Sequence, residues 1–231
     1  MMNNANCQPA NHRLTLNLDH PPSMPQSSSD NKENNTTSGI QTSENDHDVA
    51  LMLKVGSGDE HAFQELVERH QSAVIGTVAK MLGNASDAED IAQQVFIRLW
   101  KCSPRYKPKA KFTTFLFTIT RNLVFNESRR KSRKKEYSIE EREDDFHLQT
   151  PDQNNASPAQ DMLQEELREA IDQAIAKLPE KQRLAVILRR YEGLPYDEIG
   201  KVLGLSVSAI KSQLFRARHS LREQLQHYLD S

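Results

Sequence analysis

Cysteine is nearly absent from this sequence, which has only Cys7 and Cys102 among its 231 residues. Two cysteines cannot build a disulfide framework of several bridges, and neither lies in a CxxC pair of the kind that binds zinc. Long hydrophobic runs are lacking too. The N-terminus has no apolar signal core, and no stretch approaches the roughly 20 apolar residues of a membrane-spanning helix. We therefore expect a cytoplasmic protein with no direct membrane insertion.

Apolar residues are also scarce, at 36% of the chain, which is low for one compact globule of this length. Residues 1–46 are rich in Asn, Ser, Pro and Gln, and we predict a disordered tail there. Residues 136–162 are acidic and contain proline, which predicts a flexible linker. Period-two alternation of strand length is missing, whereas apolar residues recur at three- and four-residue steps. We predict an all-α protein with two small helical domains, residues 47–135 and 163–231.

Charge is unevenly distributed, so the net charge of −2 is a sum of unlike segments. Residues 47–135 carry 16 basic and 9 acidic side chains, whereas residues 136–164 carry 1 and 8. Within residues 98–135, 13 basic side chains stand against a single acid, Glu127. An asymmetry of this kind indicates an anionic partner.

Residues 87–101, DAEDIAQQVFIRLWK, are predicted to form an amphipathic helix whose first turn carries Asp87, Glu89 and Asp90. These acids could bind a hard divalent cation such as magnesium. Acids in a first turn also stabilise the positive end of the helix dipole. We favour the second explanation, because no other acidic or histidine cluster is placed to complete a metal site. Docking of a protein partner through this helix, with Phe96 and Trp100, is a third alternative.

Residues 112–135, FTTFLFTITRNLVFNESRRKSRKK, combine aromatic rings, hydroxyls and a basic tail. Rings can stack on unpaired bases, for about 1–3 kcal/mol each. Hydroxyls and amides can bond base edges, and basic side chains can follow the DNA backbone. The alternative is a core helix, since Leu116, Ile119 and Leu123 have helical spacing and some of the phenylalanines could join them. The candidate DNA-binding residues of this segment are Phe112, Thr113, Thr114, Phe115, Arg121, Asn122, Asn126, Arg129, Arg130 and Arg133.

Residues 195–229 are predicted to form a helix-turn-helix, with a short GLS turn between two helices and a basic second helix. Ser206 is a natural N-cap for that second helix. An ordinary helical hairpin with a solvated basic face would show a similar pattern. The outer face of the second helix would carry side chains that suit phosphates or base edges, namely Ser208, Lys211, Ser212, Phe215 and Arg216.

Four segments of the sequence, taken in order, resemble those of bacterial RNA polymerase sigma factors. They are DAEDIAQQVFIRLW, KFTTFLFTITRNLVFNESRR, an acidic linker and YDEIGKVLGLSVSAIKSQLFRAR. The two-domain layout without a middle domain is similar to their extracytoplasmic-function subgroup. The resemblance covers about residues 48–135 and 163–231. It implies a protein that binds core RNA polymerase, directs it to specific promoters and helps melt promoter DNA. Both duplex promoter DNA and the melted single strand would be partners. It implies an anti-sigma factor as a further partner, and no enzymatic activity, cofactor, metal or small-molecule substrate.

The resemblance also implies roles for individual residues. The segment from Arg105 to Arg133 would open the downstream promoter element and hold a flipped base. The helix that begins at Ser206 would read the upstream, minus thirty-five element. Gln213 lies at a reading position where many relatives carry arginine. Because arginine favours guanine and glutamine favours adenine, the promoter preference would be altered. Polymerase docking would fall to the helix after Ser86, where Gln94 replaces a frequent acid, through Asp87, Asp90, Gln93, Gln94 and Arg98.

Two other functions are compatible with parts of the pattern. A stand-alone helix-turn-helix regulator would bind duplex DNA without polymerase. Its recognition unit would be a single module, residues 165–231, with 11 basic and 10 acidic side chains, which is little charge for tight independent binding. A metal-dependent nuclease built on Asp87, Glu89 and Asp90 would need further convergent acids, which the sequence does not supply.

Overall fold

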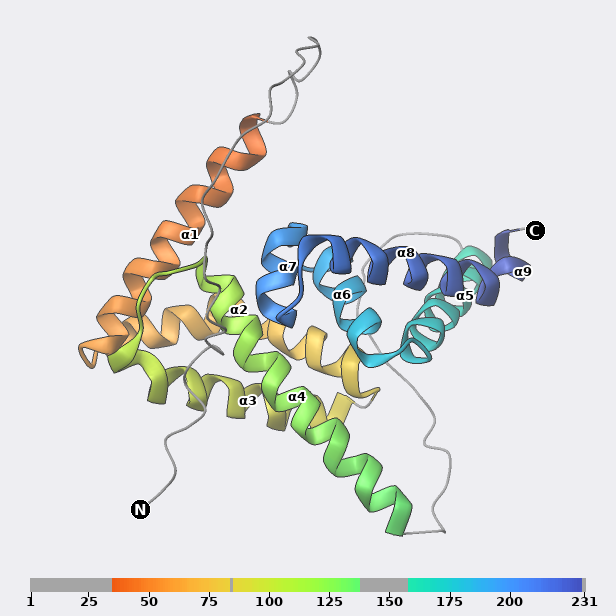
Figure 1. The fold of residues 1–231 in the computed structure, drawn as a ribbon, viewed down its shortest axis with the longest axis horizontal. Helices are drawn as coiled ribbons and strands as arrows, with labels where there is room; N and C mark the ends of the chain where they lie inside the picture. The colour runs from red at the N-terminus through yellow and green to blue at the C-terminus, as the bar shows by residue number, and fades with distance from the viewer. Residues whose placement is uncertain (1–34, 84, 138–157, 230–231) are drawn as a thin grey trace, which may run out of the picture. The chain divides into compact units, whose positions relative to one another are not determined.

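The computed structural model describes the backbone of residues 35–83, 85–137 and 158–229. All regular secondary structure in these ranges is helical, so the prediction of an all-α protein is confirmed (Figure 1). The elements in order are α1 (Asn35–Gly56), α2 (Glu60–Leu82), α3 (Ala85–Cys102), the 3-10 turn η1 (Ser103–Arg105), α4 (Phe112–Tyr137), α5 (Pro158–Ala176), α6 (Glu180–Arg190), α7 (Tyr196–Leu203), α8 (Val207–Gln224) and α9 (Gln226–Leu229).

The chain divides into two compact units, residues 1–47 and 48–231. In the first unit, residues 35–47 belong to helix α1, within the range for which the sequence predicted a disordered tail. A helix that is already nucleated extends by one hydrogen bond per residue and needs no buried side chains to do so. Burial-based reasoning therefore missed it. The remainder of the predicted tail, residues 1–34, lies outside the described residues.

The predicted linker also differs at its ends. Helix α4 continues to Tyr137, and α5 begins at Pro158. Proline suits the first position of a helix, because its missing N–H would have no intrahelical partner there. The central part of the linker, residues 138–157, lies outside the described residues.

The first helical domain of the second unit consists of α1 from Asp48 onward and α2 to α4. Asp59 caps α2 by accepting a hydrogen bond from the backbone N–H of Ala62 at 3.0 Å. Gly83 ends the helix in the left-handed conformation, with φ of 72°. The core is formed by the apolar faces of these helices, and its completely buried members include Leu66, Val74, Val78, Val95, Leu99, Phe112 and Leu116.

A buried carboxylate joins α1 to α2 in this domain. Asp48 is 3% exposed and lies 2.9 Å from both Arg69 Nε and His70 Nε2. Burial acts to raise the pKa of Asp48, but the hydrogen bonds and charges of His70 and Arg69 outweigh it and lower the pKa. The contribution of this pairing to stability is therefore present at neutral pH and lost as the pH falls through the lowered pKa.

The second helical domain contains the predicted helix-turn-helix, formed by α7 and α8. Helix α7 ends at Gly204, whose φ is 67°, and Ser206 caps α8 by accepting a hydrogen bond from the N–H of Ala209 at 3.2 Å. Gly200 lets the turn fold back on α7, because a Cβ at this position would lie 2.7 Å from the carbonyl oxygen of Leu205. Ile199 and Ile210 are fully buried between the helices.

The two helical domains are in contact. Helix α7 packs on α4, and α5 and α6 pack on α2. A continuous apolar cluster runs through buried residues of both domains, from Leu51 to Ile210. The contact brings the start of α4, which the sequence assigned to DNA binding, against the helix-turn-helix.

Candidate nucleic-acid and polymerase-binding surfaces

Helix α8 presents one continuous exposed face. Ile210 and Ala217 are buried on its inner side, so the intervening side chains of the opposite side face solvent. Phe215 is the most exposed of the large apolar residues, at 69%, and Gln213 is half-buried at the edge. The structure thus brings together, on the exposed face of one helix, the remaining predicted contacts of this segment: Ser206, Ser208, Lys211, Ser212 and Arg216.

Two of the predicted base contacts on α4 are buried. Phe112 is completely buried, and its ring lies 5.1 Å from the ring of His70. Thr114 is 4% exposed. Phe115 is half-buried, with its ring 5.1 Å from that of Tyr106, and Thr113 is half-buried as well. For Phe112 the structure therefore has the core position that the sequence left as an alternative, and in this arrangement its ring is not accessible to a base.

The second half of α4 is more exposed and strongly basic. Arg121 is half-buried and donates two hydrogen bonds to Asn122 Oδ1, at 3.1 and 2.6 Å. Burial lowers the pKa of this guanidinium. Arg130 is held by Glu127 through two hydrogen bonds of 2.8 and 2.7 Å. The remaining predicted residues, Asn126, Arg129 and Arg133, are exposed.

The predicted docking helix α3 keeps its polar residues on the surface. Asp90, Gln93 and Gln94 are exposed, and Arg98 is half-buried. Ile97 lies among them and is 53% exposed, although it is apolar. Sequence reasoning missed Ile97, and the available signal was its position three and four residues after Gln94 and Gln93, on the polar side of the helix.

A polar cavity of about 350 Å³ separates the start of α3 from α4. It is lined by Asp87, Asp90, Ile91, Gln94, Glu127 and Arg130. Asp87 forms an ion pair with Lys131, across the two helices. Among the residues that the structure describes, no group of His, Cys, Asp and Glu is placed to hold a metal ion. Asp87 is thus engaged in an ion pair, and the nuclease alternative gains no support from it.

Within the described part of the chain, no helix is long and apolar enough to cross a membrane.

Comparison with known proteins follows the same two segments. Residues 66–134 match the family model described as Sigma-70 region 2, and residues 168–221 match Sigma-70, region 4. The structure aligns with that of the sigma factor RpoE from Bartonella quintana, solved with the anti-sigma factor NepR. Its TM-score is 0.60 at 22% identity, over 71% of this chain and 96% of the other. This likeness concerns the fold.

Two curated relatives align with this chain over nearly the whole of their own length. The RNA polymerase sigma-H factor of Pseudomonas aeruginosa is 31% identical over 80% of this chain and 96% of its own. The ECF RNA polymerase sigma factor SigW of Bacillus subtilis is 33% identical over 77% of this chain and 98% of its own. The order of the two matched regions, the helix-turn-helix and this coverage agree: the chain belongs to the extracytoplasmic-function RNA polymerase sigma factors.

Proposed function

We propose that this chain binds core RNA polymerase, directs it to specific promoters and helps melt the DNA, with α3, α4 and α8 as the three contact surfaces. The observation that carries the proposal is the presence of both sigma regions in order, each with its expected helix in the structure. As a factor that acts on polymerase and promoter DNA, it would work in the cytoplasm and perform no chemistry of its own.

Helix α8 is the proposed reader of the upstream element. The predicted contacts on this helix offer hydroxyls, the amide of Gln213 at the edge and two cations, which suit phosphates and base edges in a major groove. Gln213 favours adenine where arginine would favour guanine. Phe215 can contact a thymine methyl group, because its ring is largely exposed.

Helix α3 is the proposed polymerase-docking surface. Asp90, Gln93 and Gln94 lie on the same exposed side of α3 as Ile97, and interfaces commonly combine an exposed apolar side chain with polar neighbours. The opposite side of the helix is buried in the domain core through Val95 and Leu99. The exposed side is therefore available to a partner without cost to the fold.

An anti-sigma factor is a further proposed partner. The solved structure from Bartonella quintana contains such a protein bound to a sigma factor of the same fold. A stand-alone helix-turn-helix regulator is not favoured, because it would leave the match of residues 66–134 to sigma region 2 without a purpose.

Transcription in vitro tests the proposal. Core RNA polymerase and a set of genomic promoter fragments are combined with and without the chain. We expect specific transcripts only when the chain is present, and their aligned start regions would give both promoter elements. No transcripts, together with no co-elution with core polymerase, would contradict the proposal and favour the stand-alone regulator.

The docking surface has its own test. Asp90→Arg should abolish co-elution with core polymerase while leaving the thermal unfolding midpoint nearly unchanged, because Asp90 is exposed. Glu89→Arg is the matched control, since Glu89 is the exposed neighbouring acid and is not among the predicted contacts. Loss of thermal stability in Asp90→Arg would instead make the residue structural.

A further inference from the structure

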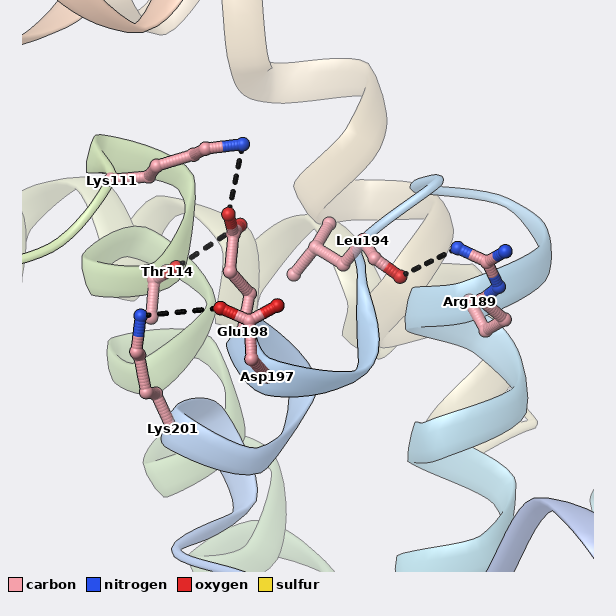
Figure 2. Close-up of polar contacts among 7 residues, drawn as sticks. All are labelled: Lys111, Thr114, Arg189, Leu194, Asp197, Glu198 and Lys201. Carbon is pink, nitrogen blue, oxygen red and sulfur yellow. Dashed lines mark hydrogen bonds and ion pairs between the residues drawn. The ribbon is translucent and has the colours of Figure 1, made fainter. Parts of the chain in front are cut away.

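A buried carboxylate of the helix-turn-helix lies against the start of α4. Glu198, in the first turn of α7, is 5% exposed. Its Oε1 lies 2.8 Å from Lys111 Nζ, and its Oε2 accepts a hydrogen bond from Thr114 Oγ1 at 3.4 Å (Figure 2). Residue 114 and residue 198 are 84 positions apart, so this is a contact between the two helical domains.

The neighbouring acid shows what is special about Glu198. Asp197 is in the same first turn of α7, but it is exposed and pairs with Lys201 of its own helix at 3.4 Å (Figure 2). Both acids favour the positive end of the helix dipole. That effect accounts for Asp197, whereas it does not account for the burial of Glu198 or for its two partners on α4.

Further polar pairs hold the same two domains together. Lys80 of α2 forms an ion pair with Asp172 of α5 at 3.1 Å, and both side chains are largely buried. Arg183 of α6 donates to the carbonyl oxygen of Met81 at 2.7 Å. These contacts link α2 to α5 and α6, and Glu198 links α7 to α4. The two helical domains are therefore held against each other at separate points, and we call this the closed arrangement.

Glu198 binds two hydrogen-bond donors, on Lys111 and Thr114, that could also bind a DNA phosphate. A carboxylate and a phosphate oxygen compete for the same ammonium and hydroxyl groups. Thr114 is among the residues that the sequence predicts to contact DNA, and Lys111 lies one turn before it. While α7 is in place, Thr114 is buried against it, and the Lys111 ammonium, whose side chain is 38% exposed, is paired with Glu198.

We propose that Glu198 is an intrachain mimic of a DNA phosphate, which latches the polymerase-free chain closed and withholds the start of α4 from DNA. The latch is a property of the structure alone; only its consequence for DNA rests on the proposed function. Opening the latch raises the population competent for DNA, and the apparent affinity rises in proportion.

The closed state can be captured in the full chain with a carbodiimide, which joins an amine and a carboxylate that are already in contact. Mass spectrometry should find Lys111–Glu198 and Lys80–Asp172 products in the free chain, and both should disappear when core polymerase is added. The Lys131–Asp87 pair, which lies within the first domain, serves as the internal control. If the free chain gives the Lys131–Asp87 product but neither of the two interdomain products, the closed state is overturned.

Glu198→Gln then tests the latch, with Asp197→Asn as the matched control for the loss of one negative charge in the same helical turn. We expect the Lys80–Asp172 product to fall in Glu198→Gln and to stay unchanged in Asp197→Asn. Exchanging the charges, in Lys111→Glu combined with Glu198→Lys, should restore it. A Lys80–Asp172 yield equal to that of the original chain in Glu198→Gln would overturn the role of Glu198.

The consequence for DNA is measured separately, by fluorescence anisotropy of a labelled single-stranded DNA at fixed salt. Glu198→Gln should bind it about threefold to tenfold more tightly than the original chain, and Asp197→Asn should not. Equal affinity, or no binding by either, would overturn the withholding of α4. Failure of the proposed function would look different, since transcription with core polymerase would then be absent for the original chain and for Glu198→Gln alike.

Discussion

Helices α4 and α8 carry similar sets of aromatic, hydroxyl and basic side chains, yet they present them differently. On α8 the ring of Phe215 is 69% exposed, whereas on α4 the ring of Phe112 is fully buried. The hydroxyls of Ser208 and Ser212 are exposed, whereas Thr114 is covered by α7. The surface proposed for duplex reading is thus exposed in the free chain, while the start of the surface proposed for the melted strand is covered.

The difference corresponds to the two forms of DNA involved. Duplex DNA exists before the polymerase arrives, so the proposed reading face on α8 would meet its target without rearrangement. Melted strands arise only at a promoter that is being opened. A surface that becomes accessible at that stage avoids binding other single strands beforehand.

The largest predicted effect compares the same substitution in both helices. Phe112→Ala should lower the free energy of unfolding by about 3–5 kcal/mol, because it opens a cavity in a fully packed core. Phe215→Ala should change it by less than about 0.5 kcal/mol, because the ring is exposed. Chemical denaturation of the two variants measures both. A small effect of Phe112→Ala would show that its ring is not a core residue in solution and would remove the contrast.

A smaller effect is expected for base reading by α8. Arg216→Ala should cost about 1–3 kcal/mol in promoter binding by the holoenzyme and relax the preference at one position of the upstream element. Arg222→Ala, which removes an exposed cation further along the same helix, is the control for charge alone. Footprinting on a set of singly substituted promoters separates the outcomes, since a uniform loss over all of them would assign Arg216 to phosphate.

The smallest predicted effect concerns Glu192, a carboxylate at the contact between the two helical domains, and the direction in which it changes stability with pH. Glu192, just after α6, accepts a hydrogen bond from Thr77 Oγ1 of α2 at 3.2 Å. Burial raises the pKa of Glu192, and the Thr77 bond and the charge of His70 offset this only in part. A raised pKa means that the folded form resists ionisation, so stability is lost as the pH rises from the unfolded pKa through the folded one.

Glu192→Gln should therefore stabilise the chain slightly. Glutamine stays neutral and still accepts from Thr77, so we expect a thermal midpoint about 1–2 °C higher at pH 7.5. The gain should vanish as the pH approaches 4, which calorimetry at several pH values can follow. A variant that is less stable than the original chain at pH 7.5 would mean that the ionised carboxylate is stabilising there.

Sequence reasoning reached those features that depend on neighbours along the chain. The cap at Ser206, the helical periodicity and the exposed face of α8 all follow from residues within a few turns of each other. It could not show that Thr114 is covered, because its partner Glu198 is 84 residues away. Helical spacing shows that α4 has an outer face, and only the tertiary contact decides what lies on it.

Gly200 and Ser206 have a consequence for engineering. The orientation of α8 is set by a close backbone approach at Gly200 and by the cap at Ser206, neither of which involves the outward side chains of residues 211–216. Those side chains can therefore be exchanged while the scaffold is kept. Libraries randomised at Lys211, Ser212, Gln213 and Arg216 should yield orthogonal promoter specificities without redesign of the turn.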